Sequence, residues 1–147
     1  LGSGKPRWND IDEIITSLIE DERHSAISVM NECQGLFLYA DPLISRALYN
    51  LFDNTLRHAG LDITNIRFWY RIEEGTCILS IEDDGRGVPG GRKEEIFARG
   101  VGENTGLGLY LIREILRITG LTIRETGVFG QGARFEITAK SGLFKVE

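Results

Sequence analysis

The sequence is poor in proline, cysteine and methionine, and it has no long apolar run. Its 147 residues include three prolines, two cysteines and one methionine. Two widely separated cysteines do not form the dense disulfide framework of small secreted proteins, so we expect Cys33 and Cys77 to be buried, reduced thiols. No apolar stretch approaches the roughly 20 residues that span a bilayer, and no signal-peptide pattern opens the chain. We therefore expect a cytoplasmic domain without membrane contact.

An excess of basic residues is also missing. The net charge is -5, whereas nucleic-acid backbones are bound by basic faces, so nucleic acid is not an expected partner. A composition of 41% hydrophobic and 27% charged residues is typical of a soluble globular protein, and the length fits one core. We expect residues 1–5 to be a cloning remnant and residues 6–147 to form one domain of a longer parent protein, whose own membrane attachment stays open.

Hydrophobic periodicity predicts three helices. Apolar residues recur at helical spacing after Pro6, and Asn9 or Asp10 can cap that helix. Pro42 suits the first position of a second helix, because the N–H that proline lacks has no partner there. The third helix follows a glycine-rich stretch. The predicted helices cover residues 6–19, 42–58 and 107–119.

Strand-like segments, rich in β-branched and aromatic residues, separate the helices. The segments are 27–30, 36–39, 67–72, 76–81, 121–125 and 133–139. The first two suit a strand, turn, strand arrangement. The third and fourth flank Glu73-Glu74-Gly75 and predict a hairpin, and the last two predict a closing hairpin. Together with the helices they predict an α+β fold, a two-layer α/β sandwich with a mixed, mostly antiparallel sheet of about five or six strands and three helices on one face.

Polar side chains gather on one face of the second predicted helix. Asn50, Asp53, Asn54, Arg57 and His58 share that face at 3.6 residues per turn. Amide oxygens suit a hard cation such as Mg²⁺, and a guanidinium suits phosphate. A face that is merely solvated would also explain the pattern.

Glycines mark three further places. Asp83 ends an apolar strand and is followed by Gly85 and Gly87, so a flat ligand could approach the backbone while the carboxylate accepts a hydrogen bond from an exocyclic amine, although a simple turn fits equally well. Residues 106–109 open onto the third helix, where free N–H groups and the helix dipole favour phosphate. Residues 130–135 enter the last strand and by themselves look like an ordinary hairpin. The loop of residues 83–108 is long enough to be functional.

In this order and spacing, the motifs resemble the ATP-binding superfamily shared by histidine kinases, DNA gyrase, MutL and the ninety-kilodalton heat-shock chaperone, known as the Bergerat fold. The resemblance runs from about Pro6 to Thr138. Residues 48–58 look like the N box, residues 83–87 like the G1 box, residues 95–97 like the F box and residues 106–109 like the G2 box.

The resemblance implies roles for individual residues. Asn54 would bind Mg²⁺ with Asn50 beside it, Arg57 would face the phosphates, and Asp83 would bind the adenine amino group of ATP. Phe97 would anchor a lid from about Val88 to Thr105, and Arg99 is our candidate for the γ-phosphate contact, because the usual second aromatic after Phe97 is missing. The remaining implied nucleotide-binding residues are His58, Gly85, Gly87, Val88, Gly106, Leu107, Gly108, Leu109, Gly132 and Ala133, the last standing where the family usually has Thr.

Within the superfamily, the sensor histidine kinases fit best. Serine kinases of the anti-sigma-factor type and the ATPases have a carboxylate one turn before the Mg²⁺-binding Asn, where this chain has Asn50, which cannot accept a proton. A neutral imidazole needs no such base, although Asp53 lies close enough to serve as one. The resemblance thus implies phosphoryl transfer to a histidine on a separate dimerisation domain, a response regulator downstream, and a monomeric isolated domain. An anti-sigma-type kinase and a non-catalytic ATP-binding module are the alternatives.

Overall fold

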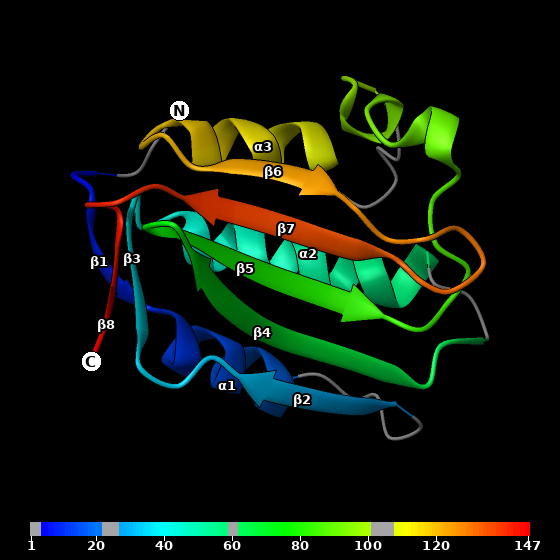
Figure 1. Ribbon diagram of the computed structural model, residues 1–147, viewed down its shortest axis with the longest axis horizontal. Helices are drawn as coiled ribbons and strands as arrows, with labels where there is room; N and C mark the ends of the chain where they lie inside the picture. Colours follow the sequence, from blue (N-terminus) through cyan, green and yellow to red (C-terminus); the bar gives the residue numbers. More distant parts are fainter. Residues whose placement is uncertain (1–3, 22–26, 59–61, 101–107) are drawn as a thin grey trace.

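The computed structural model describes residues 4–21, 27–58, 62–100 and 108–147. A five-stranded sheet forms one layer, with the strand order β2-β4-β5-β7-β6, and three helices cover one of its faces (Figure 1). Only the β2–β4 pair is parallel. The strands are β2 (Ser28–Glu32), β4 (Asn65–Glu73), β5 (Thr76–Asp83), β7 (Arg134–Ala139) and β6 (Thr122–Glu125).

A second, three-stranded sheet lies across one end of the first (Figure 1). It consists of β1 (Arg7–Asp10), β3 (Leu36–Ala40) and β8 (Phe144–Val146), all antiparallel. The helices are α1 (Ile11–Asp21), α2 (Ile44–His58) and α3 (Leu109–Arg117). Two 3-10 turns, η2 (Gly90–Arg92) and η3 (Glu95–Phe97), interrupt the long connection between β5 and α3.

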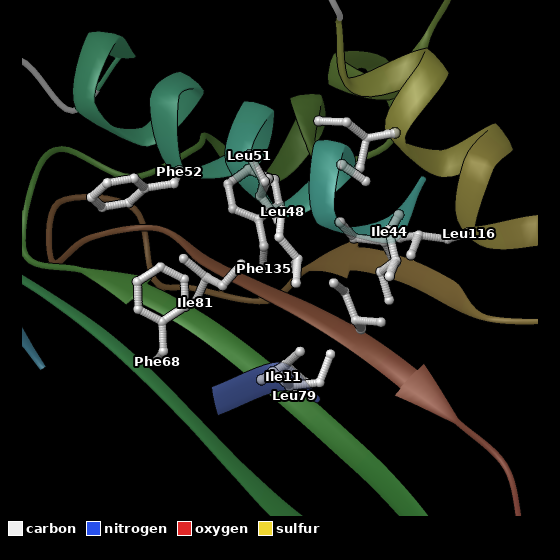
Figure 2. Packing of buried hydrophobic residues seen from close by; sticks show 14 of the residues in the cluster. Ile11, Ile44, Leu48, Leu51, Phe52, Phe68, Leu79, Ile81, Leu116 and Phe135 are labelled. Carbon is white, nitrogen blue, oxygen red and sulfur yellow. The ribbon is translucent and has the colours of Figure 1, made fainter. Parts of the chain in front are cut away.

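The core lies between α2 and the inward face of the large sheet (Figure 2). Because side chains alternate along a strand, every second residue of β4, β5 and β7 faces the helices. Phe68, Ile81 and Phe135 come from these strands, and all three are less than 5% exposed. Phe52 of α2 meets Phe68 with ring centroids 5.7 Å apart. This packing holds α2 against the strand ends that carry the candidate site.

The structure confirms the α+β sandwich and the local signals behind it. Asp10 caps α1 by accepting a hydrogen bond from the Glu13 N–H at 3.2 Å. The β4–β5 turn places Glu74 and Gly75 at φ values of 50° and 78°, as a type I′ hairpin turn requires. Cys33 and Cys77 are free and buried, and burial is the main reason that the Cys33 pKa rises to about 12.

Three details of the predicted architecture are corrected. Residues 7–10 form β1 rather than the first turn of a helix, because the Asn9 amide bonds the carbonyls of Leu38 and Ala40 at 3.3 and 3.1 Å and so joins β3. Strands β2 and β3 do not pair with each other but belong to different sheets, and β8 was not predicted. The described residues therefore hold eight strands in two sheets, and none of their helices is long and apolar enough to cross a bilayer.

Asp84 ties the end of β5 to the start of β4 and should show in the acid stability. Its carboxylate accepts hydrogen bonds from Thr64 N and Asn65 N at 2.8 and 3.0 Å and from both side chains. Partial burial alone would raise the Asp84 pKa, but these bonds outweigh it and hold the pKa well below its usual range. A lowered pKa in the folded state contributes stability above about pH 4, the unfolded value, and this contribution is lost as pH falls further.

We therefore expect Asp84→Asn to lower the melting temperature at pH 7 and to flatten its dependence on pH between 4 and 2. Thermal melts across that range measure both effects. Asp62→Asn is the matched control, because no described residue donates a hydrogen bond to that carboxylate, and it should melt like the wild type. A steep acid dependence that persists without Asp84 would contradict the assignment.

Candidate functional site

A cavity of about 500 Å³ opens at the end of the large sheet where β5 ends and β7 begins. Asn54 and Thr55 of α2 form one wall, and Leu109 of α3 lies nearby. The glycine-rich segment after β5 and the η3 residue Ile96 line other sides. The volume lies within the usual range for small-molecule sites, roughly 300–1,000 Å³.

Asp83, the last residue of β5, presents a carboxylate to this cavity while being only 7% exposed. Its Oδ1 accepts hydrogen bonds from the N–H groups of Gly85 at 2.8 Å and Ala133 at 3.2 Å. No described residue donates to Oδ2. Burial raises the Asp83 pKa, the two backbone hydrogen bonds lower it in part, and the net direction is upward. The site thus contains a fixed, desolvated acceptor with one oxygen left for a ligand.

Two glycines allow the loops around Asp83 to approach each other. Gly132 has φ 131°, and a Cβ there would lie 1.9 Å from the Asp83 carbonyl oxygen. Gly87 has φ 82°, and a Cβ there would lie 2.7 Å from the Gly132 carbonyl oxygen. A side chain at either place would force backbone apart, so glycine has a steric cause at both positions, of which the sequence had singled out Gly87 for close backbone approach.

The polar face of α2 divides between two surroundings. Asn54, 7% exposed, lines the cavity. Arg57 is instead paired with Asp53 at 2.9 Å, with its side chain 59% exposed. Asn50 donates to the Arg46 carbonyl at 2.8 Å and lies in a second hollow, with Leu18 of α1. The predicted cluster therefore brings one residue to the cavity, and the His58 side chain lies outside the described residues.

The predicted lid anchor is buried beside the cavity rather than in its wall. Phe97 is 2% exposed and meets Phe135 edge-on at 6.2 Å. Arg113 of α3 lies over the Phe97 ring at 4.1 Å and holds both carboxylate oxygens of Glu94, at 2.8 and 3.2 Å. The hydrogen bonds from Arg113 lower the Glu94 pKa. Arg113, which the sequence did not point to, thus fixes the 3-10 segment to α3.

A second tie was also missed. Lys93 donates to Glu125, whose side chain is fully buried, and to the Gly127 carbonyl at 2.8 Å. The other Glu125 oxygen accepts from Gly127 N at 2.8 Å and Arg134 N at 2.9 Å. The ion pair joins the residue after η2 to the last residue of β6 across 32 residues of sequence, and no spacing rule covers such a separation.

The remaining predicted residues differ in where they lie. Gly87, Val88, Leu109 and Ala133 line the cavity as expected, and Gly108 stands at the N-cap of α3. Arg99 lies over the Tyr110 ring at 5.8 Å and does not line the cavity. Gly106 and Leu107 lie outside the described residues. Lining residues that the sequence did not point to include Arg86, Arg92 and Phe129.

Comparison with known sequences gives a consistent family. Residues 40–142 match the model of the histidine kinase-, DNA gyrase B-, and HSP90-like ATPase family. The sensor protein KdpD of Escherichia coli is 30% identical over 145 residues, which cover 91% of this chain and 16% of KdpD. The alginate biosynthesis sensor protein KinB of Pseudomonas aeruginosa is 35% identical over 97 residues, or 63% of this chain and 16% of KinB. The chain therefore spans about one sixth of these relatives.

Solved structures share the fold. The ATP-binding domain of PrrB from Mycobacterium tuberculosis superposes with a TM-score of 0.75 at 20% identity, covering 94% of this chain and 98% of that one. Histidine kinase ThkA, solved in complex with the response regulator TrrA, superposes with a TM-score of 0.74 at 22% identity, covering 92% and 42%. At these identities the likeness concerns the fold.

Proposed function

The chain belongs to the histidine kinase-, DNA gyrase B-, and HSP90-like ATPase family, and from this premise we propose that it is the ATP-binding catalytic domain of a sensor histidine kinase. One observation carries the proposal. Asp83 stands at the cavity with one oxygen available, beside apolar walls and the buried Asn54 amide. A purine with an exocyclic amine, attached to phosphates, fits that combination of acceptor, apolar surface and amide.

Each part of the site has a distinct task in this proposal. Asp83 accepts a hydrogen bond from the adenine amine, and Val88, Ile96 and Leu109 exclude water from the base. Asn54 would provide an oxygen for Mg²⁺, which would neutralise phosphate charge when bound. The amides at the start of α3 face the phosphates. The γ-phosphoryl group passes from ATP to an imidazole nitrogen on a separate dimerisation domain, leaving ADP.

The roles of Asn50, Asp53, Arg57 and Arg99 stay predictions. The Asp53 carboxylate is paired with Arg57 at 2.9 Å, so it is not positioned as a free base. This agrees with transfer to histidine, which needs no base on the kinase. The known relatives are sensor kinases, and the serine-kinase alternative is not favoured. By analogy with ThkA and TrrA, we propose a response regulator as the downstream partner.

Phosphoryl transfer itself is tested by mixing the chain with a separately produced dimerisation and phospho-acceptor domain and γ-labelled ATP. We expect label on the acceptor domain that is stable in base and labile in acid, as phosphohistidine is. Tight ATP binding without any transfer would favour a non-catalytic binding module. Acid-stable label would indicate a hydroxyl acceptor instead.

Mg²⁺ should strengthen ATP binding through Asn54. We expect removal of Mg²⁺ with a chelator to weaken ATP binding by about tenfold, on the order of 1.4 kcal/mol, and Asn54→Ala to remove most of that gain. Asn50→Ala is the matched comparison, one helical turn away and outside the cavity, and should have the smaller effect. Isothermal titration with and without the metal measures both. Equal losses in the two variants would place both amides on the metal.

A further inference from the structure

The tip of the β6–β7 loop exposes two large apolar side chains. Val128 is 60% exposed and Phe129 is 53% exposed. The two are neighbours in sequence, but only Phe129 lines the cavity. A half-exposed aromatic ring leaves much of its apolar surface in water, and beside a ligand cavity that surface is available to a bound molecule. The sequence marked only the neighbouring residues 130–135, and the proposed function gives Val128 and Phe129 no task.

Hydrogen bonds hold the loop in place at its base and at its tip. At the base, Gly127 is bound through its carbonyl to Lys93 and through its N–H to Glu125, each at 2.8 Å. At the tip, Gly130 N donates to the Arg86 carbonyl at 2.7 Å. The Phe129 Cα lies 3.3 Å from the place where a Cβ on Gly87 would stand. The backbone of Phe129 is therefore held against the glycine-rich segment that follows Asp83.

This position selects the part of the ligand that Phe129 meets. The loop tip lies against Arg86 and Gly87, which closely follow Asp83, the residue that receives the base. The start of α3, which receives the phosphates, is a different element of the site. Charged phosphates gain little beside an aromatic ring, whereas a nucleobase stacked on one gains about 1–3 kcal/mol. Asp83 accepts a hydrogen bond from the amine of the base, but this bond leaves the two flat faces of the base without a contact.

We propose that Phe129 is a nucleotide-binding residue that contacts the adenine ring and, with Asp83, sets the affinity of the site for the nucleobase. The inference rests on the proposed function, because it needs a nucleotide in this cavity. Asp83 supplies the directional contact, and Phe129 supplies apolar contact area at the open edge.

The test compares Phe129→Ala with Phe129→Tyr and with Val128→Ala, which removes the more exposed neighbour that does not line the cavity. The ATP dissociation constant is measured for each with Mg²⁺ present. We expect an increase of about tenfold for Phe129→Ala, and values within about twofold of wild type for the other two. Because both side chains are largely exposed, melting temperatures without ligand should stay close to the wild type.

Three results would overturn the assignment. Phe129→Ala could bind ATP like the wild type, Val128→Ala could lose as much affinity as Phe129→Ala, or Phe129→Tyr could lose as much affinity as Phe129→Ala. If the wild-type chain binds no ATP, the proposed function is wrong as well. If the wild type binds ATP and Phe129→Ala binds it with the same affinity, only this inference is wrong.

A spectroscopic readout tests contact directly. Phe129→Trp places an indole at the cavity edge, and its fluorescence is obtained by subtracting the wild-type signal of the two native tryptophans. We expect ATP to quench or shift the added emission, since a base stacked on an indole changes its surroundings. No change on addition of saturating ATP would overturn the contact.

Discussion

Asp83→Asn is expected to lower the affinity for ATP by about 100-fold or more, some 2.7 kcal/mol. The Gly85 and Ala133 N–H groups both require an acceptor, so the amide must keep its oxygen toward them. Its NH₂ group then takes the place of Oδ2 and faces the adenine amine. A donor meets a donor where an acceptor was, and the bond is lost rather than weakened.

The same substitution should leave the ligand-free domain as stable as the wild type, or more stable. Burial raises the Asp83 pKa, so the stability associated with this group is complete below the unfolded pKa of about 3.9 and is lost as pH rises through the folded value. The amide carries no charge and avoids that loss at pH 7. Calorimetric titration and thermal melts of both proteins decide the matter. An unchanged ATP affinity would contradict the assigned pocket, and a collapsed fold would assign Asp83 a structural role.

Glu125→Ala and Lys93→Met are expected to destabilise the fold strongly. Removing Glu125 leaves the N–H groups of Gly127 and Arg134 without their acceptor, and we expect a loss of about 3 kcal/mol in the free energy of unfolding. Lys93→Met leaves a buried carboxylate without its cation. Because the Lys93 side chain is 28% exposed, solvent screens part of the effect, and we expect about 2 kcal/mol.

Urea denaturation measures these losses, and Arg92→Met provides the control. Arg92 neighbours Lys93, but its pair with Glu95 at 3.5 Å is exposed on both sides, so its loss should cost under about 0.5 kcal/mol. Combining Lys93→Met with Glu125→Gln should recover part of the Lys93→Met loss, since the charge that was left alone is removed. Equal losses in the free energy of unfolding for Lys93→Met and Arg92→Met would show that the buried pair contributes no more stability than an exposed one.

Local signals explain what could be predicted of the fold. The Asp10 cap, the Glu74-Gly75 turn and the long amphipathic α2 depend on residues within a few positions of one another. The division into two sheets does not. Asn9 joins β1 to β3 through carbonyls 29 and 31 residues away, and β8 pairs with β3 from the far end of the chain. The helical spacing after Pro6 hid this strand, because Trp8 fits the apolar pattern of a helix and Asn9 and Asp10 are residue types that cap one.

The candidate site also combines residues that local motifs predict with residues that only the packing of distant elements brings in. Asn54, Asp83, Gly87 and Leu109 lie in motifs whose spacing could be read directly, and the structure brings these four together. A position on the same helix face predicted the site less well, because Asn50 and Arg57 share a face with Asn54 but do not line the cavity. Phe129, Lys93 and Arg113 belong to no motif. Their contacts arise only when distant elements pack, so a single sequence carries no signal for them.

The contact between Gly87 and Gly132 limits how the pocket can be redesigned. Neither position tolerates even a methyl group without moving backbone, so mutagenesis for a different base would have to leave these two glycines unchanged. Useful diversity has to come from side chains that project into the cavity from fixed supports, such as Val88, Ile96 and Phe129. A library confined to such positions would sample new ligand preferences while keeping the strand ends in register.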